Sequence, residues 1–344
     1  MPDFALIQLA PGRFLLGWGP FRHLPSPDPL LPSFYLNDYF LDAETPWKIP
    51  DSWEIVERGE LGSRLGGPQP PAIDWQPLDD VSFQSLFRSA HSALARGEFG
   101  KIVPIMFQTG VVREGDPAAY LVERLAMLPP EMWAYAYRIG EEGMAGASPE
   151  TLFTLGEGLV ETMAVAGTRG LDRVRELADD PKEREEHELV VRDLEQQLRD
   201  LGRVEVSPTT VVELPTLAHL VTLVSVRPRS MPSFEEVVRR LHPTAALGSS
   251  PRNEAARQWL RNADRGIGRG TFGAPFGVLF EDRSAICLVA IRNVAWNGER
   301  VRIGSGAGVL VESTLENERK ELKRKRDQVR ALFGLAPERD GVPA

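Results

Sequence analysis

The sequence contains very little cysteine and no long apolar run. Its one cysteine, Cys287, excludes an internal disulfide and any metal site built from several cysteines. No stretch reaches about 18 consecutive apolar residues, so we expect no transmembrane helix. The first residues carry no basic segment ahead of an apolar one. We therefore expect no signal peptide and a cytoplasmic location.

Positive charge is also in short supply. Lysine and arginine number 40 against 49 aspartates and glutamates, which gives a net charge of −9 over 344 residues. Nucleic acids and anionic membranes attract basic surfaces, so this balance predicts that neither is a partner. Hydrophobic residues make up 42% of the chain and charged residues 26%, which indicates an ordinary folded protein and excludes wholesale disorder.

Proline is abundant but unevenly distributed. Of the 28 prolines, 13 lie in residues 1–77, and this density prevents long helices and central strands. We therefore expect residues 1–80 to form a variable, proline-rich segment that contributes short strands. Longer periodic patterns begin near Val81 and predict a larger domain over residues 81–337.

Within this larger domain, strands are expected to follow one another directly. Asn297-Gly298 favours a type I′ turn and predicts a hairpin between 285–296 and 300–310. Such an order favours large antiparallel or mixed sheets with helices packed outside, which is the α+β class. The expected helices are 81–96, 121–128, 182–201, 234–241, 252–262 and 315–333, and the other expected strands are 101–107, 132–139, 148–155, 159–165, 204–213 and 217–226.

Two of the expected helices carry carboxylates three residues apart, a spacing that places both on one helix face. They are Glu183 and Glu186 on one helix, and Glu318 and Glu321 on the other, where Lys325 follows one turn later. If the helices converge, the four carboxylates would form an oxygen-only site suited to Mg²⁺, because a cation would offset their repulsion. Two solvent-exposed helix faces are the alternative.

Three further features have two interpretations each. Arg292 ends an apolar run, so it either forms a structural salt bridge or meets another anion. Lys101 is either an ordinary lysine at the edge of a strand or a base with a lowered pKa. The glycines between Gly304 and Gly308 either form a bulge or let the backbone approach an anion closely.

The order of these segments resembles the chorismate-utilising enzymes, which include isochorismate synthase, salicylate synthase, anthranilate synthase component I and aminodeoxychorismate synthase component I. The resemblance covers residues 81–334 and is carried by ten ordered motifs. They are GKIV (100–103), ASPETLF (147–153), VAGTR (165–169), EH with VV (186–187 and 190–191), HLVT (219–222), LHPTAALG (241–248), RGTFGAPFG (269–277), VAIR (289–292), GAG (306–308) and the pattern from Glu318 through Glu321 to Lys325. It implies a fold like that of anthranilate synthase component I and a chorismate-binding catalytic domain over residues 81–337.

The resemblance also implies a mechanism and a site. The four glutamates would hold Mg²⁺, Lys101 would take a proton from the attacking water, and Glu150 would protonate the departing 4-hydroxyl of chorismate. For this chemistry Lys101 needs a lowered pKa and Glu150 a raised one. The positions that the resemblance implies for substrate binding are Thr168, His219, Arg292, Gly306, Gly308 and Lys325.

Three positions bear on the product. Amine-transferring relatives typically have glutamine at the position of Lys101, and aminodeoxychorismate synthases often have a nucleophilic lysine at that of Ala166. Phe272 stands where many salicylate synthases have tyrosine. The resemblance therefore favours an isochorismate synthase serving menaquinone or siderophore synthesis, a monomer or homodimer without a glutaminase partner. A salicylate synthase, an amine-transferring enzyme and a non-catalytic chorismate-binding scaffold are the alternatives.

Overall fold

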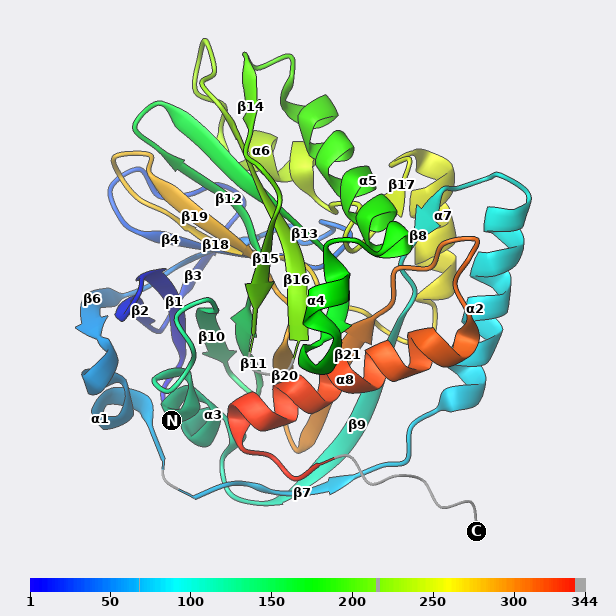
Figure 1. Cartoon of the computed structure of the whole chain (residues 1–344). Coiled ribbons are helices and arrows are strands. Elements are labelled where there is room, and N and C mark those ends of the chain that lie inside the picture. The colour runs from blue at the N-terminus through cyan, green and yellow to red at the C-terminus, as the bar shows by residue number, and fades with distance from the viewer. Residues whose placement is uncertain (68, 215–216, 338–344) are drawn as a thin grey trace.

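A computed structural model of the chain describes residues 1–67, 69–214 and 217–337. Two large antiparallel sheets form its centre, and the longer helices lie around them (Figure 1). The expected α+β class is confirmed. Within the described part of the chain, no helix combines the length and the apolar character that crossing a membrane requires.

The first sheet has nine strands in the order β6-β2-β1-β10-β11-β20-β21-β9-β7. In that order they are β6 (Ser52–Glu57), β2 (Arg13–Trp18), β1 (Phe4–Ala10), β10 (Trp133–Ile139), β11 (Glu142–Ser148), β20 (Asn293–Asn297), β21 (Arg300–Gly306), β9 (Ile105–Glu114) and β7 (Ala72–Trp75). Two further strands, β17 (Ser249–Ser250) and β8 (Lys101–Ile102), form a small separate ladder.

The second sheet has ten strands, nine of them along the path β14-β16-β13-β12-β19-β18-β4-β5-β3, and β15 also pairs with β16. They are β14 (Val204–Val206), β16 (Leu217–Val226), β13 (Leu159–Gly170), β12 (Thr151–Gly156), β19 (Ala285–Val289), β18 (Pro275–Leu279), β4 (Ser33–Leu36), β5 (Trp47–Ile49), β3 (Arg22–Leu24) and β15 (Thr210–Glu213). Strands from residues 1–80 thus belong to both sheets, since β1 pairs with β10 and β4 pairs with β18.

The two longest helices, α5 (Pro181–Leu198) and α8 (Leu315–Phe333), have capping residues that favour their observed ends. α5 follows Asp180, whose carboxylate accepts a hydrogen bond from Glu183 N and so satisfies a free N–H group. α8 ends at Gly334, which adopts the left-handed conformation. The other helices are α1 (Leu61–Leu65), α2 (Asp80–Ala95), α3 (Pro117–Leu125), α4 (Val174–Leu177), α6 (Phe234–Leu241) and α7 (Glu254–Ala263).

The two sheets pack face to face over a shared apolar core. Ile7 and Tyr135 from the first sheet and Phe276 and Leu288 from the second are buried in one cluster. The outer face of the second sheet packs on α5 and α6, and that of the first sheet packs on α3 and α8. Both sheets therefore have apolar side chains on two faces, and their burial is the main stabilising contribution to the fold.

The expected hairpin is confirmed as a strand pair, but its turn and its start are wrong. β20 and β21 pair with Asn297 opposite Arg300, so the two-residue loop is Gly298-Glu299 and lies one residue later than expected. Of these two loop residues only Gly298 has a positive φ, whereas a type I′ turn needs two. The run 285–296, however, is two strands: β19 ends at Val289 in the second sheet, and β20 begins at Asn293 in the first. The chain crosses between the sheets through Arg292, whose φ is +54°. A continuous apolar run does not reveal such a crossing, because residues on either side of it are equally buried.

The sequence patterns also missed β11. Its glycines lower the strand propensity of the segment, yet they are required by the packing around it. A Cβ atom at Gly143 would lie 2.2 Å from the indole of Trp296, and one at Gly146 would lie 2.3 Å from the phenol of Tyr135. The strand expected at 204–213 is in fact two, β14 and β15, with Pro208 between them.

Candidate active site

Most of the residues singled out from the sequence surround one small cavity at the junction of the two sheets and α8. The cavity has a volume of about 50 Å³, which is room for only a few water molecules. The sequence-derived residues that line it are Glu150, Thr168, Glu186, His219, Arg292, Gly306, Gly308 and Lys325. Lys101 contacts this lining through Glu186, whereas Glu183, Glu318 and Glu321 lie behind it.

Glu150 and Arg292 reach the cavity because each lies where the chain crosses from one sheet to the other. Glu150 lies between β11 and β12, and Arg292 lies between β19 and β20. The two crossings are hydrogen-bonded to each other, from Ala147 N to Arg292 O and from Val289 N to Glu150 O, at 3.1 Å each. This arrangement fixes the backbone positions from which a carboxyl group and a guanidinium group reach the same cavity.

Lys101 is fully buried, and its Nζ atom lies 2.8 Å from Glu186 Oε1. Gly308 covers this ion pair, because a Cβ atom there would lie 2.3 Å from Glu186 Oε1 and 2.9 Å from Lys101 Cε. Of the two interpretations of the glycines, close backbone approach to an anion thus describes Gly308, and the anion is a carboxylate of the protein itself. Lys101 is not an ordinary lysine at a solvent-exposed strand edge.

The four glutamates lie on helices that converge. Lys182 Nζ on α5 is 3.1 Å from Glu318 Oε1 on α8, so the two helices meet at this point. Glu183, Glu186 and Glu318 are buried, and the interpretation as solvent-exposed helix faces is therefore wrong. Glu183 Oε2 also accepts a hydrogen bond of 2.7 Å from Thr168 N.

Burial and mutual repulsion shift the pKa values of these carboxyl groups. Burial, with Coulombic repulsion from neighbouring glutamates, raises the pKa of Glu183 and that of Glu318 to about 7. Burial acts in the same direction on Glu321, but Lys325 and Lys182 outweigh it and lower its pKa. Lys325 Nζ lies 2.6 Å from Glu321 Oε1 and also donates to Gly306 O at 2.8 Å.

The glutamates fit a divalent cation by their chemistry. They offer only oxygen atoms, and Glu318 Oε2 is buried without a hydrogen-bond partner. Their present geometry is different, since no three His, Cys, Asp or Glu side chains in the described ranges stand close enough to hold a metal ion. Lysine ammonium groups neighbour Glu186, Glu318 and Glu321 instead.

Glu150 has the properties of a general acid. Burial raises the pKa of its carboxyl group to about 7, although a hydrogen bond from Thr244 and the charges of Lys101, Arg292 and Lys325 oppose the shift. Thr244 Oγ1 lies 3.4 Å from Glu150 Oε1. A carboxyl group with a pKa near 7 is protonated in a substantial fraction of molecules at neutral pH, so it can donate a proton to a leaving group.

His219 and Thr168 are cross-strand partners on β16 and β13. Thr168 Oγ1 lies 3.0 Å from His219 Nδ1, whereas His219 Nε2 is buried without a hydrogen-bond partner. Burial, together with Arg292 and Lys325, lowers the pKa of His219 to about 3, so its imidazole is neutral near pH 7. A neutral ring with one free nitrogen at the cavity can hydrogen-bond a ligand without adding charge.

Sequence reasoning missed three residues at the site. Gln328 on α8 accepts a hydrogen bond of 2.5 Å from Arg292 Nε, and burial lowers the pKa of that arginine to about 10. Thr244 contacts Glu150, and Lys182 contacts Glu318. Gln328 lies seven residues after Glu321, on the same face of the helix, and this spacing was the available signal.

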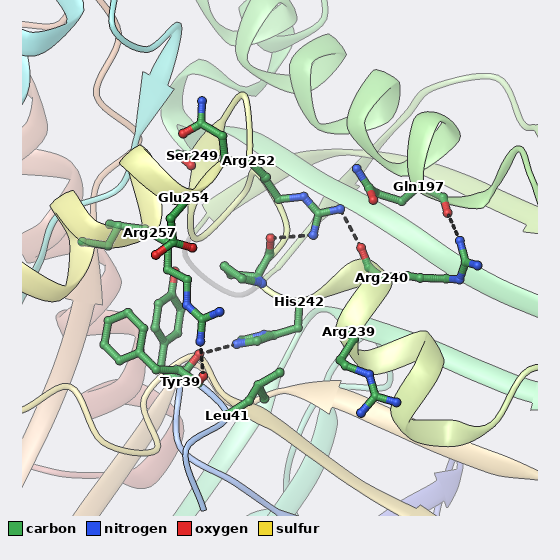
Figure 2. Close-up of a pocket in the computed structure, with 14 residues that line it drawn as sticks. Tyr39, Leu41, Gln197, Arg239, Arg240, His242, Ser249, Arg252, Glu254 and Arg257 are labelled. Carbon is green, nitrogen blue, oxygen red and sulfur yellow. Dashed lines mark hydrogen bonds between the residues drawn. The ribbon is translucent and has the colours of Figure 1, made fainter.

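A larger cavity, of about 440 Å³, lies beside the segment 242–249, which also lines the smaller one (Figure 2). Three of its four arginines, Arg240, Arg252 and Arg257, already have partners within the protein. Arg252 pairs with Asp193 at 2.9 Å and donates to the carbonyls of Pro243 and Arg240. His242 Nε2 lies 2.7 Å from Tyr39 O. These contacts brace the segment that carries Thr244, and the lysine–carboxylate set is found at the smaller cavity.

Comparison with known proteins identifies the family. The profile described as chorismate binding enzyme matches residues 48–331. The salicylate biosynthesis isochorismate synthase of Pseudomonas aeruginosa is 31% identical over 268 residues, which cover 74% of this chain and 55% of that protein. Anthranilate synthase component 1 of Aeropyrum pernix is 28% identical over 271 residues, which cover 74% and 60%. The chain thus spans little more than half the length of these relatives.

A solved structure agrees with this match at the level of the fold. MenF, the menaquinone-specific isochorismate synthase of Escherichia coli, aligns with a TM-score of 0.81 at 20% identity, over 97% of this chain and 89% of that one. The expected resemblance, inferred above from ten short motifs, is confirmed. The chain belongs to the family of chorismate binding enzymes.

Proposed function

We propose that the protein is an isochorismate synthase, which adds water at C2 of chorismate and releases the 4-hydroxyl group. The observation that carries the proposal is the pairing of a buried Lys101 with Glu186 at a cavity that also holds Glu150, whose pKa is about 7. Lys101, in its neutral amine form, would take a proton from water, and Glu150 would give one to the departing hydroxyl. Base and acid would thus act within one enclosed site.

Positive and neutral donors around the cavity suit a dicarboxylate substrate. Arg292 and Lys325, with backbone N–H groups near Gly306 and Gly308, would hold the two carboxylates. His219 and Thr168 would contact the ring. A cavity of about 50 Å³ is far below the roughly 300 Å³ or more of most ligand sites, so substrate binding requires the lining side chains to move apart.

The four glutamates would hold a Mg²⁺ ion, which would supply positive charge for the ring carboxylate of the substrate. Support comes from their oxygen-only donor set, their burial and the unpartnered Glu318 Oε2. The roles of the chain's own residues do not depend on that ion. Arg292 would orient a substrate carboxylate, and Glu150 would hold the proton that it donates. The backbone at Gly308 keeps Lys101 against Glu186.

The reaction products decide between the proposal and its alternatives. Purified protein is incubated with chorismate and Mg²⁺, with and without ammonium, and the products are separated by chromatography. We expect isochorismate in both cases. Salicylate with pyruvate would indicate a salicylate synthase, and an aminated product would overturn the assignment of water as the nucleophile. Chorismate binding by calorimetry without any turnover would favour a scaffold.

A further inference from the structure

Three lysines neutralise the carboxylate cluster in this structure, one for each of three glutamates. Lys101 contacts Glu186 at 2.8 Å, Lys325 contacts Glu321 at 2.6 Å, and Lys182 contacts Glu318 at 3.1 Å. Buried carboxylates that carry charge need such partners, because an uncompensated buried charge is strongly destabilising. The lysines therefore supply the positive charge that a bound cation would otherwise supply.

Lys182 differs from the other two lysines in how firmly it is held. The Lys101 side chain is fully buried beneath Gly308, and Lys325 has a second partner in Gly306 O. The Lys182 side chain is 26% exposed, and its ammonium group has one hydrogen-bond partner among the residues that the structure describes. Its side chain therefore has solvent to move into, and its departure would break this one described contact, with Glu318.

The position of Lys182 in its helix points the same way. It lies in the first turn of α5, where the positive end of the helix dipole disfavours a cation. What holds the ammonium group against the cluster is the negative charge of Glu318, with further attraction from Glu321 and Glu186. A divalent cation bound to the same carboxylates would remove that attraction.

We propose that Lys182 is a displaceable counter-ion of the carboxylate cluster. It neutralises Glu318 when no divalent cation is bound and competes with Mg²⁺ for that carboxylate. The inference rests on the proposed function in one respect, namely that these glutamates bind Mg²⁺. Its consequence is that Lys182 lowers the affinity of the cluster for the metal while stabilising the metal-free protein.

The test compares three variants with the parent protein by calorimetric titration with MgCl₂ and by thermal unfolding without metal. Lys182→Met removes the ammonium group, Lys182→Arg keeps the charge, and Lys320→Met removes an exposed lysine elsewhere on α8 that pairs with Glu316. We expect Lys182→Met to bind Mg²⁺ roughly 3- to 10-fold more tightly than the parent and to unfold at a lower temperature without metal. The other two variants should retain the parent affinity.

The outcomes separate the two levels of the proposal. If the parent protein binds Mg²⁺ and Lys182→Met binds it equally or more weakly, the counter-ion role is wrong while the metal site stands. If the parent protein binds no Mg²⁺, the metal site and the role of Lys182 both fail. Should Lys182→Met fold poorly, a Lys182→Arg variant that binds Mg²⁺ markedly more tightly than the parent would also contradict competition by charge.

Discussion

Lys101 shows how much of the proposed chemistry depends on single side chains. Its amino group is enclosed between Glu186 and the backbone at Gly308. We expect Lys101→Ala to lower turnover of chorismate by about 10²- to 10⁴-fold, the usual loss on removing a general base. Lys48→Ala is the matched control, because its ammonium group donates to Thr45 O away from the cavity. Full turnover by Lys101→Ala would exclude the assigned base.

The raised pKa of Glu150 predicts a pH dependence. A general acid works in its protonated form, and the protonated fraction of this carboxyl group falls as the pH rises through about 7. The kcat/KM of the parent protein should therefore decline above neutral pH. Glu150→Gln should lose most turnover and this limb of the profile, whereas Glu161→Gln, at an exposed position on β13, should retain both. A flat parent profile between pH 6 and 9 would contradict the assignment.

Gly308 is a position where a single methyl group should be costly. A Cβ atom would overlap Glu186 Oε1, and moving this carboxylate aside would disturb its ion pair with the buried Lys101. We expect Gly308→Ala to lower the free energy of unfolding by about 1–3 kcal/mol and to reduce turnover. Gly59→Ala serves as the control, since nothing lies within 4 Å of its added Cβ atom. Denaturant titration would show equal stability of the two variants if the overlap were relieved cheaply.

At the scale of elements, the segment 242–249 is held in place by the guanidinium group of Arg252, which does not itself line the smaller cavity. Arg252 pairs with Asp193. It also donates to the carbonyls of Pro243 and Arg240 (Figure 2), so its loss would leave these groups unpaired. We expect Arg252→Met to lower the free energy of unfolding by about 2–4 kcal/mol. It should also raise KM, because Thr244 would lose its support. Arg192→Met, which breaks an exposed pair with Glu188, should cost at most about 0.5 kcal/mol.

The elements also show where a sequence stops being informative. The spacing of Glu183 and Glu186, and the order of the family motifs, predicted the helices that carry the carboxylates. Helix periodicity, however, does not tell which lysine will meet which carboxylate, and the contact of Lys182 with Glu318 depends on how α5 and α8 cross. β11 escaped notice because its glycines are selected by neighbouring aromatic rings and not by strand propensity.

The whole molecule depends on strands from its first residues. β1 lies between β2 and β10, and Leu6 on it is fully buried. The proline count predicted short strands here and no central ones, and the second expectation is wrong, because β1 and β4 each lie between two other strands. Their place inside both sheets depends on tertiary packing, which composition does not reveal. We expect Leu6→Ala to cost about 2–5 kcal/mol of unfolding free energy. Leu30→Ala, at a side chain that is 73% exposed, should change it by less than about 0.5 kcal/mol. Chemical denaturation of both variants measures the difference.

The two backbone ties between the sheet crossings have a consequence for redesign. Because the crossing that presents the Glu150 carboxyl group is bonded to the crossing that presents the Arg292 guanidinium group, neither can shift along the chain alone. Lengthening either crossing by one residue would therefore displace both Glu150 and Arg292 from their present positions at the cavity. We therefore expect specificity to be easier to change by substituting residues of the cavity wall, such as Phe272 or Val165, than by grafting new loops at the crossings.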